Sequence, residues 1–277
     1  MSEKLEKSEK RIIDRTEIPL SRESLAERLG DCGLKAGSTV IVHLAMSPLG
    51  WVIGGAEAVI LALIDALGTA GTLMMVAHSG NNSDPSNWGH PPVPESWWQM
   101  IRDHAPAFNP QTTPTRGVGA VPELFRRWPG TLRSNHPSFS FTARGPNADY
   151  LLSEHPLEED CGDRSPLGKL YELDAEVLLL GVTHWNNTSL HLAEFRASYP
   201  GKSVEQSGCA ILVDGQRRWV EYQGFSTSSD DFGPLGEAFD AAHQVQVHKI
   251  NAAEVRLFKQ RAAVDFGVKW MEENRRE

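Results

Sequence analysis

The chain has 277 residues, of which 40% are hydrophobic and 23% are charged. These proportions are typical of an ordered globular protein, and they exclude a disordered or fibrous chain. With 36 acidic and 27 basic residues, the net charge is −9. That charge disfavours nucleic acid and anionic membranes as partners. It either attracts cationic small molecules or simply aids solubility.

The cysteine content and the N-terminus indicate the compartment. Cys32, Cys161 and Cys209 are too few and too scattered for a disulfide framework or a zinc ribbon. The N-terminal segment MSEKLEKSEKRIIDR is charged throughout, so we do not expect a signal peptide. The sequence contains no apolar run of the length that spans a bilayer. We therefore expect a reducing, cytoplasmic setting.

The first predicted elements are a charged tail over residues 1–15, mobile or a frayed helix, and a domain over 16–277. Ser21 predicts the cap of an amphipathic helix. STVIVHLA then predicts a buried strand that ends at His43, AEAVILALIDALG an apolar helix, and TLMMVA a second buried strand. This order of strand, helix and strand favours an α/β fold.

Residues 79–116 differ from the rest because they are rich in proline and hold three tryptophans, Trp88, Trp97 and Trp98. One helix is predicted around PESWWQMIRDH. A long aromatic insertion between core elements forms either a lid or wall on the substrate side of a site, or an ordinary packed excursion. Trp97 and Trp98 are accordingly either walls of a binding site or packing residues.

The remaining elements continue the alternation of helices and strands. GVGAVPELFRRW predicts a helix from near Val118, FSFTARG and EVLLLGV predict strands, and the turn THWNNTS leads into the helix LHLAEFRA. CAILVDG and RRWVEYQ predict a β-hairpin across Asp214 and Gly215. KQRAAVDFGVKWMEEN predicts a last amphipathic helix, which packs either internally or in a homodimer. We expect an α/β fold of one domain with a mixed central sheet flanked by helices, as a monomer or a homodimer.

The strongest local signal for chemistry is the segment EVLLLGVTHWNNTSLHLAE, in which a buried strand leads through a polar turn into a helix. His191 and Glu194 are three residues apart on that helix, which places both on one face. A carboxylate beside an imidazole orients it and favours its charged form, as a general base requires. A purely structural contact between a histidine and a glutamate would have the same spacing.

Other polar residues lie near the ends of predicted strands. His43, His78 and His136 are such residues, but the sequence has no HExxH motif and no paired carboxylate at zinc spacing, so no metal site is expected. His43 and His136 are expected to hydrogen-bond to backbone around a cleft. Gly54 and Gly55 precede a helix, where free N–H groups and the helix dipole favour a phosphate. A Gly-Gly pair in that place is also common without a ligand.

The order of these segments resembles that of the aminoglycoside 3-N-acetyltransferases, over nearly the whole chain. The most specific part is the succession of an Arg-Ser-Pro element, a buried strand and the segment NNTSLHLAE. The other segments that carry the resemblance are VIVHLAMSPLGWVIGGAEAVILALIDALGTAGTLMM and GVGAVPELFRRWPGTLRSNHPSFSFTARGP. The resemblance implies acetyl-CoA as co-substrate, no metal, and direct transfer of the acetyl group to the 3-amino group of an aminoglycoside.

The resemblance also implies roles for particular residues. His191 would be the general base, Glu194 would orient it or meet the cationic substrate, and Ser165 would donate a hydrogen bond near the reaction centre. The residues implied for the coenzyme channel are His43, Ser47, Gly54, Gly55, His136 and Ser140. The candidates for contacts with the acceptor are Glu194, Asp230, Asp231, Trp97 and Glu158, the last as part of the acidic run Glu158-Glu159-Asp160. That run is otherwise a solvated loop.

Two departures from the family pattern bear on the substrates. Ala45 replaces a serine that many members carry near the coenzyme, and the acceptor contacts fall in variable parts such as 79–116 and 226–232. Three alternatives therefore stay open. They are transfer to an amine other than an aminoglycoside, a metal-dependent amidohydrolase built on the strand-end histidines, and a non-catalytic protein that binds coenzyme A.

Overall fold

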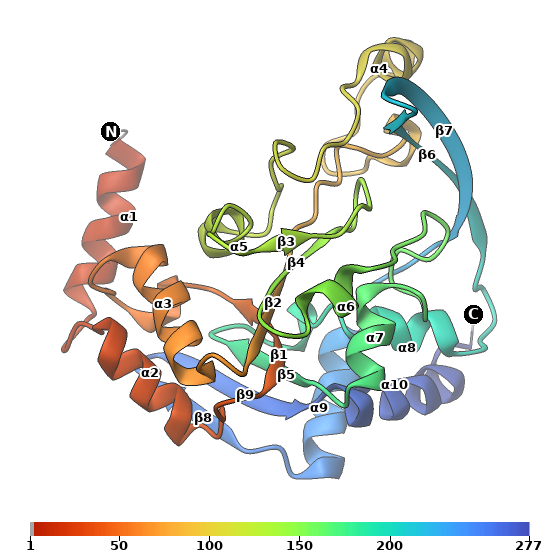
Figure 1. The fold of residues 1–277 in the computed structure, drawn as a ribbon. Helices are drawn as coiled ribbons and strands as arrows, with labels where there is room; N and C mark the ends of the chain where they lie inside the picture. The colour runs from red at the N-terminus through yellow and green to blue at the C-terminus, as the bar shows by residue number, and fades with distance from the viewer. Residues whose placement is uncertain (1–2, 277) are drawn as a thin grey trace.

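The computed structural model describes residues 3–276, and its centre is a mixed sheet of seven strands (Figure 1). The strands within this range are β1 (Thr39–Leu44), β2 (Thr72–Val76), β3 (Leu132–Arg133), β4 (Phe141–Arg144), β5 (Glu176–Leu180), β6 (Val204–Val213), β7 (Gln216–Phe225), β8 (Val247–Ile250) and β9 (Ala253–Lys259). The sheet has the order β3-β4-β2-β1-β5-β9-β8, and β6 pairs with β7 in a separate ribbon. β2, β1 and β5 are parallel and the other pairs are antiparallel, which confirms the predicted mixed sheet.

Helices flank this sheet. They are α1 (Glu3–Asp14), α2 (Arg22–Asp31), α3 (Gly55–Leu67), α4 (Trp98–His104), α5 (Ala120–Phe125), α6 (Ala148–Leu152), α7 (Pro166–Glu172), α8 (Leu190–Arg196), α9 (Phe232–His243) and α10 (Gln260–Asn274). Short 3-10 turns are η1 (Ser47–Leu49), η2 (Pro85–Asn87), η3 (Glu95–Trp97) and η4 (His184–Asn186). Within residues 3–276, no helix combines the length and the apolar composition needed to cross a bilayer.

Alternate residues of the central strands point to opposite faces of the sheet, and both faces are buried. Val40 and Val42 of β1 pack in one apolar cluster with residues of α2 and α3. Ile41, between them, packs in a second cluster with residues of α6 to α10. A strand that is buried on both sides has a continuous run of apolar residues, as at Val40, Ile41 and Val42. Because both faces are covered, the strand ends are the places left for a ligand to enter.

Most predicted elements are present, and several boundaries follow from local chemistry. Ser21 caps α2 in a reciprocal pair of hydrogen bonds with Ser24, as predicted. The hairpin turns at Asp214 and Gly215, with Val213 paired to Gln216. The helix predicted from near Val118 begins later, at Ala120. The segment 1–15 forms the helix α1 over most of its length, and Figure 1 shows it projecting from the body.

The predicted insertion, residues 79–116, packs against the β6–β7 ribbon, and near its end it also contacts Arg133 of β3. The N–H of Phe108 donates to the carbonyl of Ala210 at 2.8 Å, and Arg217 donates to the carbonyl of Ala105 at 2.7 Å. Figure 1 shows α4 of the insertion beside the turn of the ribbon, on the side away from β8. The insertion and the ribbon therefore form one projecting wall over an end of the sheet.

Candidate active site

The carboxyl ends of β2, β1 and β5 meet at one edge of the sheet, because these three strands are neighbours and parallel. His43 is near the end of β1, His78 follows β2, and the loop after β5 leads to His191 on α8. In α/β folds, ligands bind where such strand ends and helix starts meet. The fold therefore brings together three histidines that are far apart in the sequence.

These three histidines line a single cavity of about 250 Å³, which we call the histidine chamber. Its other walls include the apolar or amide side chains of Val76, Val118, Phe139, Asn187 and Phe232. No Asp, Glu, Lys or Arg of the described chain lines it. Within residues 3–276, no group of three or more His, Cys, Asp or Glu side chains is placed to hold a metal ion.

His191 and Glu194 form the predicted pair on α8. The distance between His191 Nδ1 and Glu194 Oε2 is 2.8 Å. Glu194 is buried, and its side chain is only 3% exposed. An ionised carboxylate can only accept, so Nδ1 carries the proton and donates it to Glu194. His191 Nε2 is then left with a free lone pair, as a base needs, and the ring of Phe232 lies 4.8 Å away, centroid to centroid.

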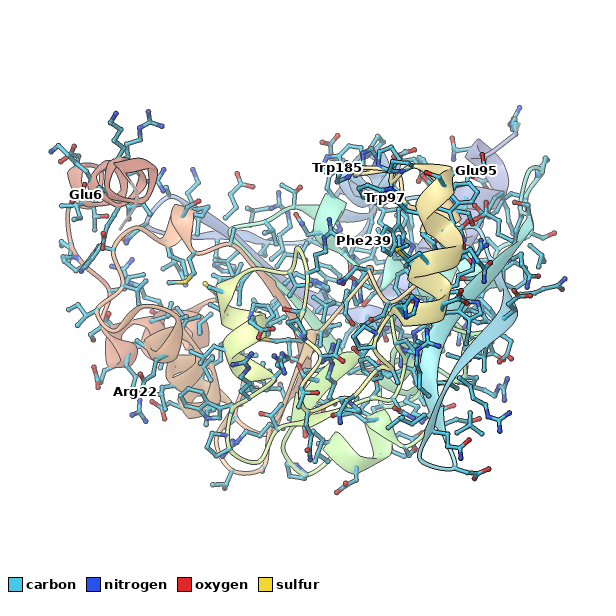
Figure 2. The ribbon with its side chains drawn as sticks, turned by 90° about the horizontal axis from the view of Figure 1, so that it is seen from above. Glu6, Arg22, Glu95, Trp97, Trp185 and Phe239 are labelled. Atoms are coloured by element: carbon cyan, nitrogen blue, oxygen red, sulfur yellow. The ribbon has the colours of Figure 1, made fainter. Side chains whose placement is uncertain are left out.

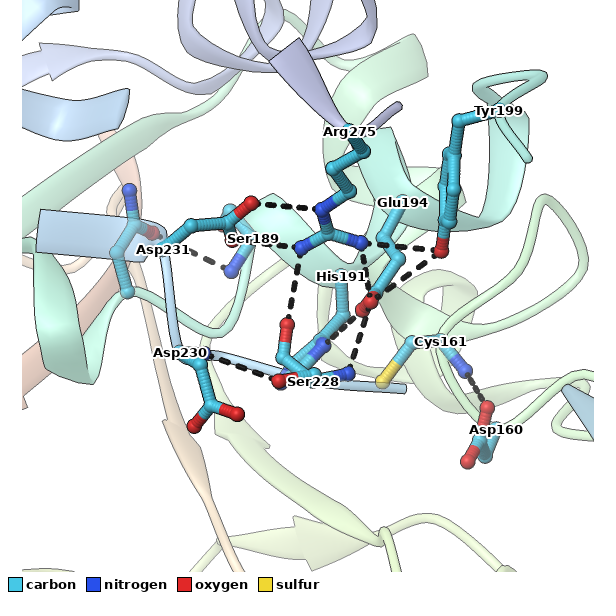
Figure 3. Close-up of polar contacts among 11 residues, drawn as sticks. Asp160, Cys161, Ser189, His191, Glu194, Tyr199, Ser228, Asp230, Asp231 and Arg275 are labelled. Atoms are coloured by element: carbon cyan, nitrogen blue, oxygen red, sulfur yellow. Dashed lines mark hydrogen bonds and ion pairs between the residues drawn. The ribbon is translucent and has the colours of Figure 1, made fainter. Parts of the chain in front are cut away.

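The charge of Glu194 is held by several partners (Figure 3). Burial alone would raise its pKa. The hydrogen bond and charge of His191, the backbone N–H of Ser228 at 2.8 Å and the guanidinium of Arg275 at 2.6 Å outweigh burial, so the pKa of Glu194 stays below its ordinary value. Glu194 is therefore a carboxylate at neutral pH and keeps His191 in one orientation and one tautomer.

A larger groove, of about 440 Å³, lies between the insertion and the β6–β7 ribbon, and we call it the outer groove. Trp88 and His90 of the insertion line one part of it, and Glu205 and Tyr222 of the ribbon line another. Asp160 lines it as well. Burial raises the pKa of Asp160 to about 6, although the charge of His191 and the N–H of Cys161 oppose that rise.

The two cavities are neighbours, because Phe139 lines both the histidine chamber and the outer groove. A third hollow, the Arg275 pocket, shares Ser226 and Thr227 with the outer groove and contains Glu194. His191 thus lines a small uncharged chamber, and a wider groove that carries acidic side chains adjoins this chamber at Phe139. Two neighbouring cavities of different character suit a reaction between two different molecules.

Three of the residues predicted for the site are structural in this conformation. Ser165 is fully buried and caps α7, since its Oγ donates to the carbonyl of Gly162 and accepts from the N–H of Leu167. His136 and Ser140 are also fully buried. His136 accepts the N–H of Phe139, which confirms its expected bond to backbone, and Ser140 donates to the carbonyl of Ala77. None of the three side chains presents a surface to a coenzyme.

The other residues predicted for the coenzyme channel are His43, within β1, and Ser47, Gly54 and Gly55, between β1 and the first turn of α3. The connection follows Leu44, the last residue of β1, which lines the histidine chamber. Ser47 and Gly54 on it are exposed and Gly55 is partly exposed. Gly54 and Gly55 have φ of 86° and 59°, values that favour glycine. His43 lines the chamber, but its Nε2 has no hydrogen-bond partner, so the expected bond to backbone is absent there.

The residues predicted to contact the acceptor are not gathered in one place. Asp230 and Asp231 line the Arg275 pocket, and Asp231 is paired with Arg275 at 2.7 Å. Glu158 is exposed. Trp97 is 55% exposed, and Figure 2 places it at one end of α4. The wall of the outer groove is formed by Trp88 instead.

Sequence reasoning missed two residues of the site, Arg275 and Tyr222. Arg275 is 81 positions from Glu194 and stands after the last helix, so no local pattern marks it. Of the acidic run 158–160, which was a candidate for the acceptor site, Asp160 is the carboxylate that lines the groove.

Comparisons with known proteins identify the family. The family model described as aminoglycoside 3-N-acetyltransferase matches residues 41–272. The SPbeta prophage-derived aminoglycoside N(3')-acetyltransferase-like protein YokD of Bacillus subtilis (strain 168) is 46% identical over 96% of this chain and 97% of its own length. Aminoglycoside N(3)-acetyltransferase VIII of Streptomyces fradiae is 37% identical over 95% of this chain and 96% of its own length.

Solved structures show the same fold. The crystal structure of YokD matches with a TM-score of 0.92 and covers 96% of this chain and 98% of that chain. The structure of AAC-IIIb with CoASH has a TM-score of 0.84 at 33% identity, over 94% of this chain and 98% of that chain. The structure of AAC-VIa bound to sisomicin has a TM-score of 0.84 at 28% identity, over 93% of this chain and 99% of that chain. The chain is therefore an acyltransferase and belongs to the aminoglycoside 3-N-acetyltransferase family.

Proposed function

We propose that this protein transfers the acetyl group of acetyl-CoA directly to the 3-amino group of an aminoglycoside, with His191 as the general base. The observation that carries the proposal is the bond of 2.8 Å from His191 Nδ1 to Glu194, which leaves Nε2 free on a residue that lines the histidine chamber. The name of the family and the CoASH bound to AAC-IIIb support acetyl-CoA as the donor.

The histidine chamber suits the acetyl thioester. A chamber of about 250 Å³ is smaller than the roughly 300–1,000 Å³ of pockets that hold a whole ligand, so it fits the reacting end of a long molecule. Its lining lacks carboxylates that would repel an anionic donor. The loop from Leu44 to Gly54 and Gly55 would then guide the phosphate-bearing part of the donor toward the N-terminus of α3.

The outer groove suits the acceptor. Asp160 and Glu205 supply two negative charges against the one positive charge of Arg116. Trp88 and Tyr222 supply flat apolar faces of the kind that pack on sugar rings. A bound ammonium group would favour the ionised form of Asp160. Sisomicin, an aminoglycoside, is the ligand of the structurally similar AAC-VIa. Glu194 and Asp231 are already paired with Arg275, so they are not part of this proposed acceptor site.

Each residue of the pair has one task in the reaction. His191 Nε2 takes a proton from the amine as the nitrogen attacks the thioester carbon. Glu194 stabilises the imidazolium that results, since its charge is held in place by Arg275. General-base catalysis of this kind contributes roughly 10²–10⁴-fold. Holding the donor and the acceptor together contributes further, because the attack then becomes effectively unimolecular.

The test is thiol release from acetyl-CoA, measured with purified protein and a panel of gentamicin-like and kanamycin-like acceptors. The acetylated position in the product is then assigned by NMR. We expect release that depends on the acceptor, and a fall of at least 10²-fold in His191→Ala, a loss of the order that general-base catalysis supplies. Full activity in His191→Ala would overturn the role of the histidine. Binding of acetyl-CoA without release to any aminoglycoside would point to another amine.

A further inference from the structure

Two buried nitrogens in the histidine chamber have no partner. His43 Nε2 and His78 Nε2 are both shielded from solvent and accept or donate no hydrogen bond within the described chain. Buried polar atoms without partners are rare in native proteins, and each one calls for an explanation. Both imidazoles line the chamber that also contains His191. A ligand in the chamber would therefore meet two nitrogens that have no other bond to give up.

Both rings are held in place by the fold. His43 belongs to β1 at the middle of the sheet, where it is paired with Leu179 of β5. His78 is in edge contact with Phe139 and Phe141, with centroid distances of 5.1 and 5.5 Å. Groups that are fixed before the substrate arrives need little reorganisation during the reaction, and such groups stabilise a transition state most effectively.

Both rings are also neutral at physiological pH. Burial lowers the pKa of His43 to about 4. Burial lowers the pKa of His78 to about 3, and the nearby charges of His191 and His43 contribute to the fall. A neutral imidazole donates a hydrogen bond through one N–H and brings no net charge into an apolar chamber. It can thus polarise a carbonyl group without attracting a counter-ion.

We propose that the Nε2–H groups of His43 and His78 together hold the carbonyl oxygen of the acetyl thioester and stabilise the negative charge that it acquires. This inference rests on the proposed function, because it assigns a role to two further side chains of the same chamber. Both histidines would be catalytic residues, since they touch the reacting oxygen.

The step balances with the groups already described. The amine nitrogen forms a bond to the carbonyl carbon, the π pair of the carbonyl moves to the oxygen, and His191 takes one proton from the nitrogen. The oxygen, now an anion, is held by the two Nε2–H donors. When the carbonyl re-forms, the bond between carbon and sulfur breaks and the thiolate leaves with the electron pair. The proton held by His191 then passes to the thiolate, which gives the amide and free coenzyme A.

The first experiment measures turnover in His43→Leu and His78→Phe. Loss of one donor to an oxyanion lowers kcat by roughly 10²–10³-fold. Both replacements exchange an unpartnered polar group for an apolar one of similar size, so we expect the melting temperature to stay the same or to rise. His248→Leu is the matched control, because His248 lies on β8 at the far edge of the sheet. A kcat within twofold of the wild type in both chamber variants would overturn the inference.

The second experiment needs no acceptor. Acetyl-CoA with a ¹³C label in the acetyl carbonyl is bound to the protein, and the carbonyl stretch is read by isotope-edited infrared spectroscopy. We expect a shift to lower frequency in the wild type and in His248→Leu. We expect each chamber variant to bind acetyl-CoA with the same affinity and to lose part of that shift. The same frequency in the wild type and in both variants would show that neither histidine touches the oxygen.

These measurements separate the inference from the function on which it rests. Wild-type protein that binds no acetyl-CoA and releases no thiol would overturn the proposed function, and the roles of His43 and His78 with it. Wild-type protein that transfers the acetyl group, with variants that do so equally well, would overturn only the roles of the two histidines. His191→Ala should lose turnover but keep the infrared shift, because His191 acts on the amine.

Discussion

Arg275 and Glu194 form an ion pair of 2.6 Å that joins the segment after α10 to the pair of His191 and Glu194 on α8 (Figure 3). The same guanidinium donates hydrogen bonds to both carboxylate oxygens of Asp231. It also donates to the hydroxyl of Tyr199 and to the carbonyl of Ser228. Arg275 therefore fixes one oxygen of Glu194 while the other oxygen accepts from His191. It is a positioning residue, since it acts on the reaction through Glu194.

Arg275→Ala should change the pH dependence of turnover. The guanidinium is one of the partners that keep the pKa of Glu194 low, so its loss should raise that pKa and move the acidic limb of the kcat profile to higher pH. At pH 6 we expect kcat to fall by about tenfold, as for loss of one hydrogen bond to a charged group. Arg275→Lys should be more active than Arg275→Ala, because lysine restores the positive charge but not the planar guanidinium group that bonds through several N–H groups.

Arg276→Ala is the matched control for that variant. Arg276 is the exposed neighbour, and its guanidinium bonds only to the carbonyl of Glu273 among the interactions described for it. Its removal changes the net charge by the same amount, so the pH profile should stay as in the wild type. If the acidic limb of the pH profile of kcat shifts equally in Arg275→Ala and Arg276→Ala, the net charge of the protein sets that limb. The contact of Arg275 with Glu194 would then not set it.

Glu194→Gln should destabilise the protein at neutral pH but not in acid. The pKa of Glu194 is lower in the folded than in the unfolded chain, so its charge contributes stability above the unfolded pKa. That contribution is lost as the pH falls through the folded pKa. At pH 7 we expect a loss of about 3 kcal/mol, since the change breaks a buried ion pair. Urea unfolding between pH 3 and 8 measures this, with Glu237→Gln, an exposed carboxylate on α9, as control.

Asp160→Asn should weaken binding of a cationic acceptor and make that binding independent of pH. In the wild type the carboxyl group has a pKa of about 6, so KM for the acceptor should rise as the pH falls through that value. The variant should keep a KM that is higher by roughly tenfold at pH 8, as for loss of one charged hydrogen bond. Steady-state kinetics across the pH range measures both effects, and Asp149→Asn on α6 is the control. An acceptor KM in Asp160→Asn equal to that of the wild type at pH 8 would remove Asp160 from the acceptor site.

The same variant should be more stable than the wild type at high pH. The pKa of Asp160 is raised by folding, so its ionisation above about pH 6 opposes the folded state. Asp160→Asn removes that effect, and its melting temperature should exceed that of the wild type at pH 8 but not at pH 4. This trade of stability for function is common at binding sites, where groups are placed for a ligand rather than for the fold.

Gly236→Ala should destabilise the protein far more than Gly233→Ala, although both glycines lie on α9. A Cβ at Gly236 would stand 2.0 Å from the ring of His184, which is buried and bonded to Asp240 at 2.9 Å. A Cβ at Gly233 would meet the ring of Trp185, which is half exposed and free to turn away. Overpacking at a fixed site costs about 1–3 kcal/mol. Thermal unfolding of the two variants measures the difference, and equal stability would contradict it.

The central pair could be predicted from the sequence because its signal is local. His191 and Glu194 are on one turn of a helix that follows a buried strand, so spacing and context suffice. Arg275 could not be found in this way, since its contact with Glu194 depends on how α10 packs beside α8. His136 and Ser140 lie in a segment that the family resemblance assigns to the coenzyme channel, and both side chains are fully buried. Burial of this kind depends on how the chain packs, which a sequence motif does not contain.

The elements that were not predicted have weak local patterns. In β9, Arg256 and Lys259 interrupt the apolar run because the strand lies toward one edge of the sheet. α9 begins with the sequence FGPLG, which is typical of a loop. Its glycines are needed for a different reason, namely the close approach of His184 and Trp185. Tertiary packing, which no short window contains, decides both cases.

The wall formed by the insertion and the β6–β7 ribbon contributes no strand to the seven-stranded sheet. Under the proposed function, the chemistry and the choice of acceptor would therefore depend on different parts of one chain. A substitution in the wall would then change which amine binds and leave the pair of His191 and Glu194 in place.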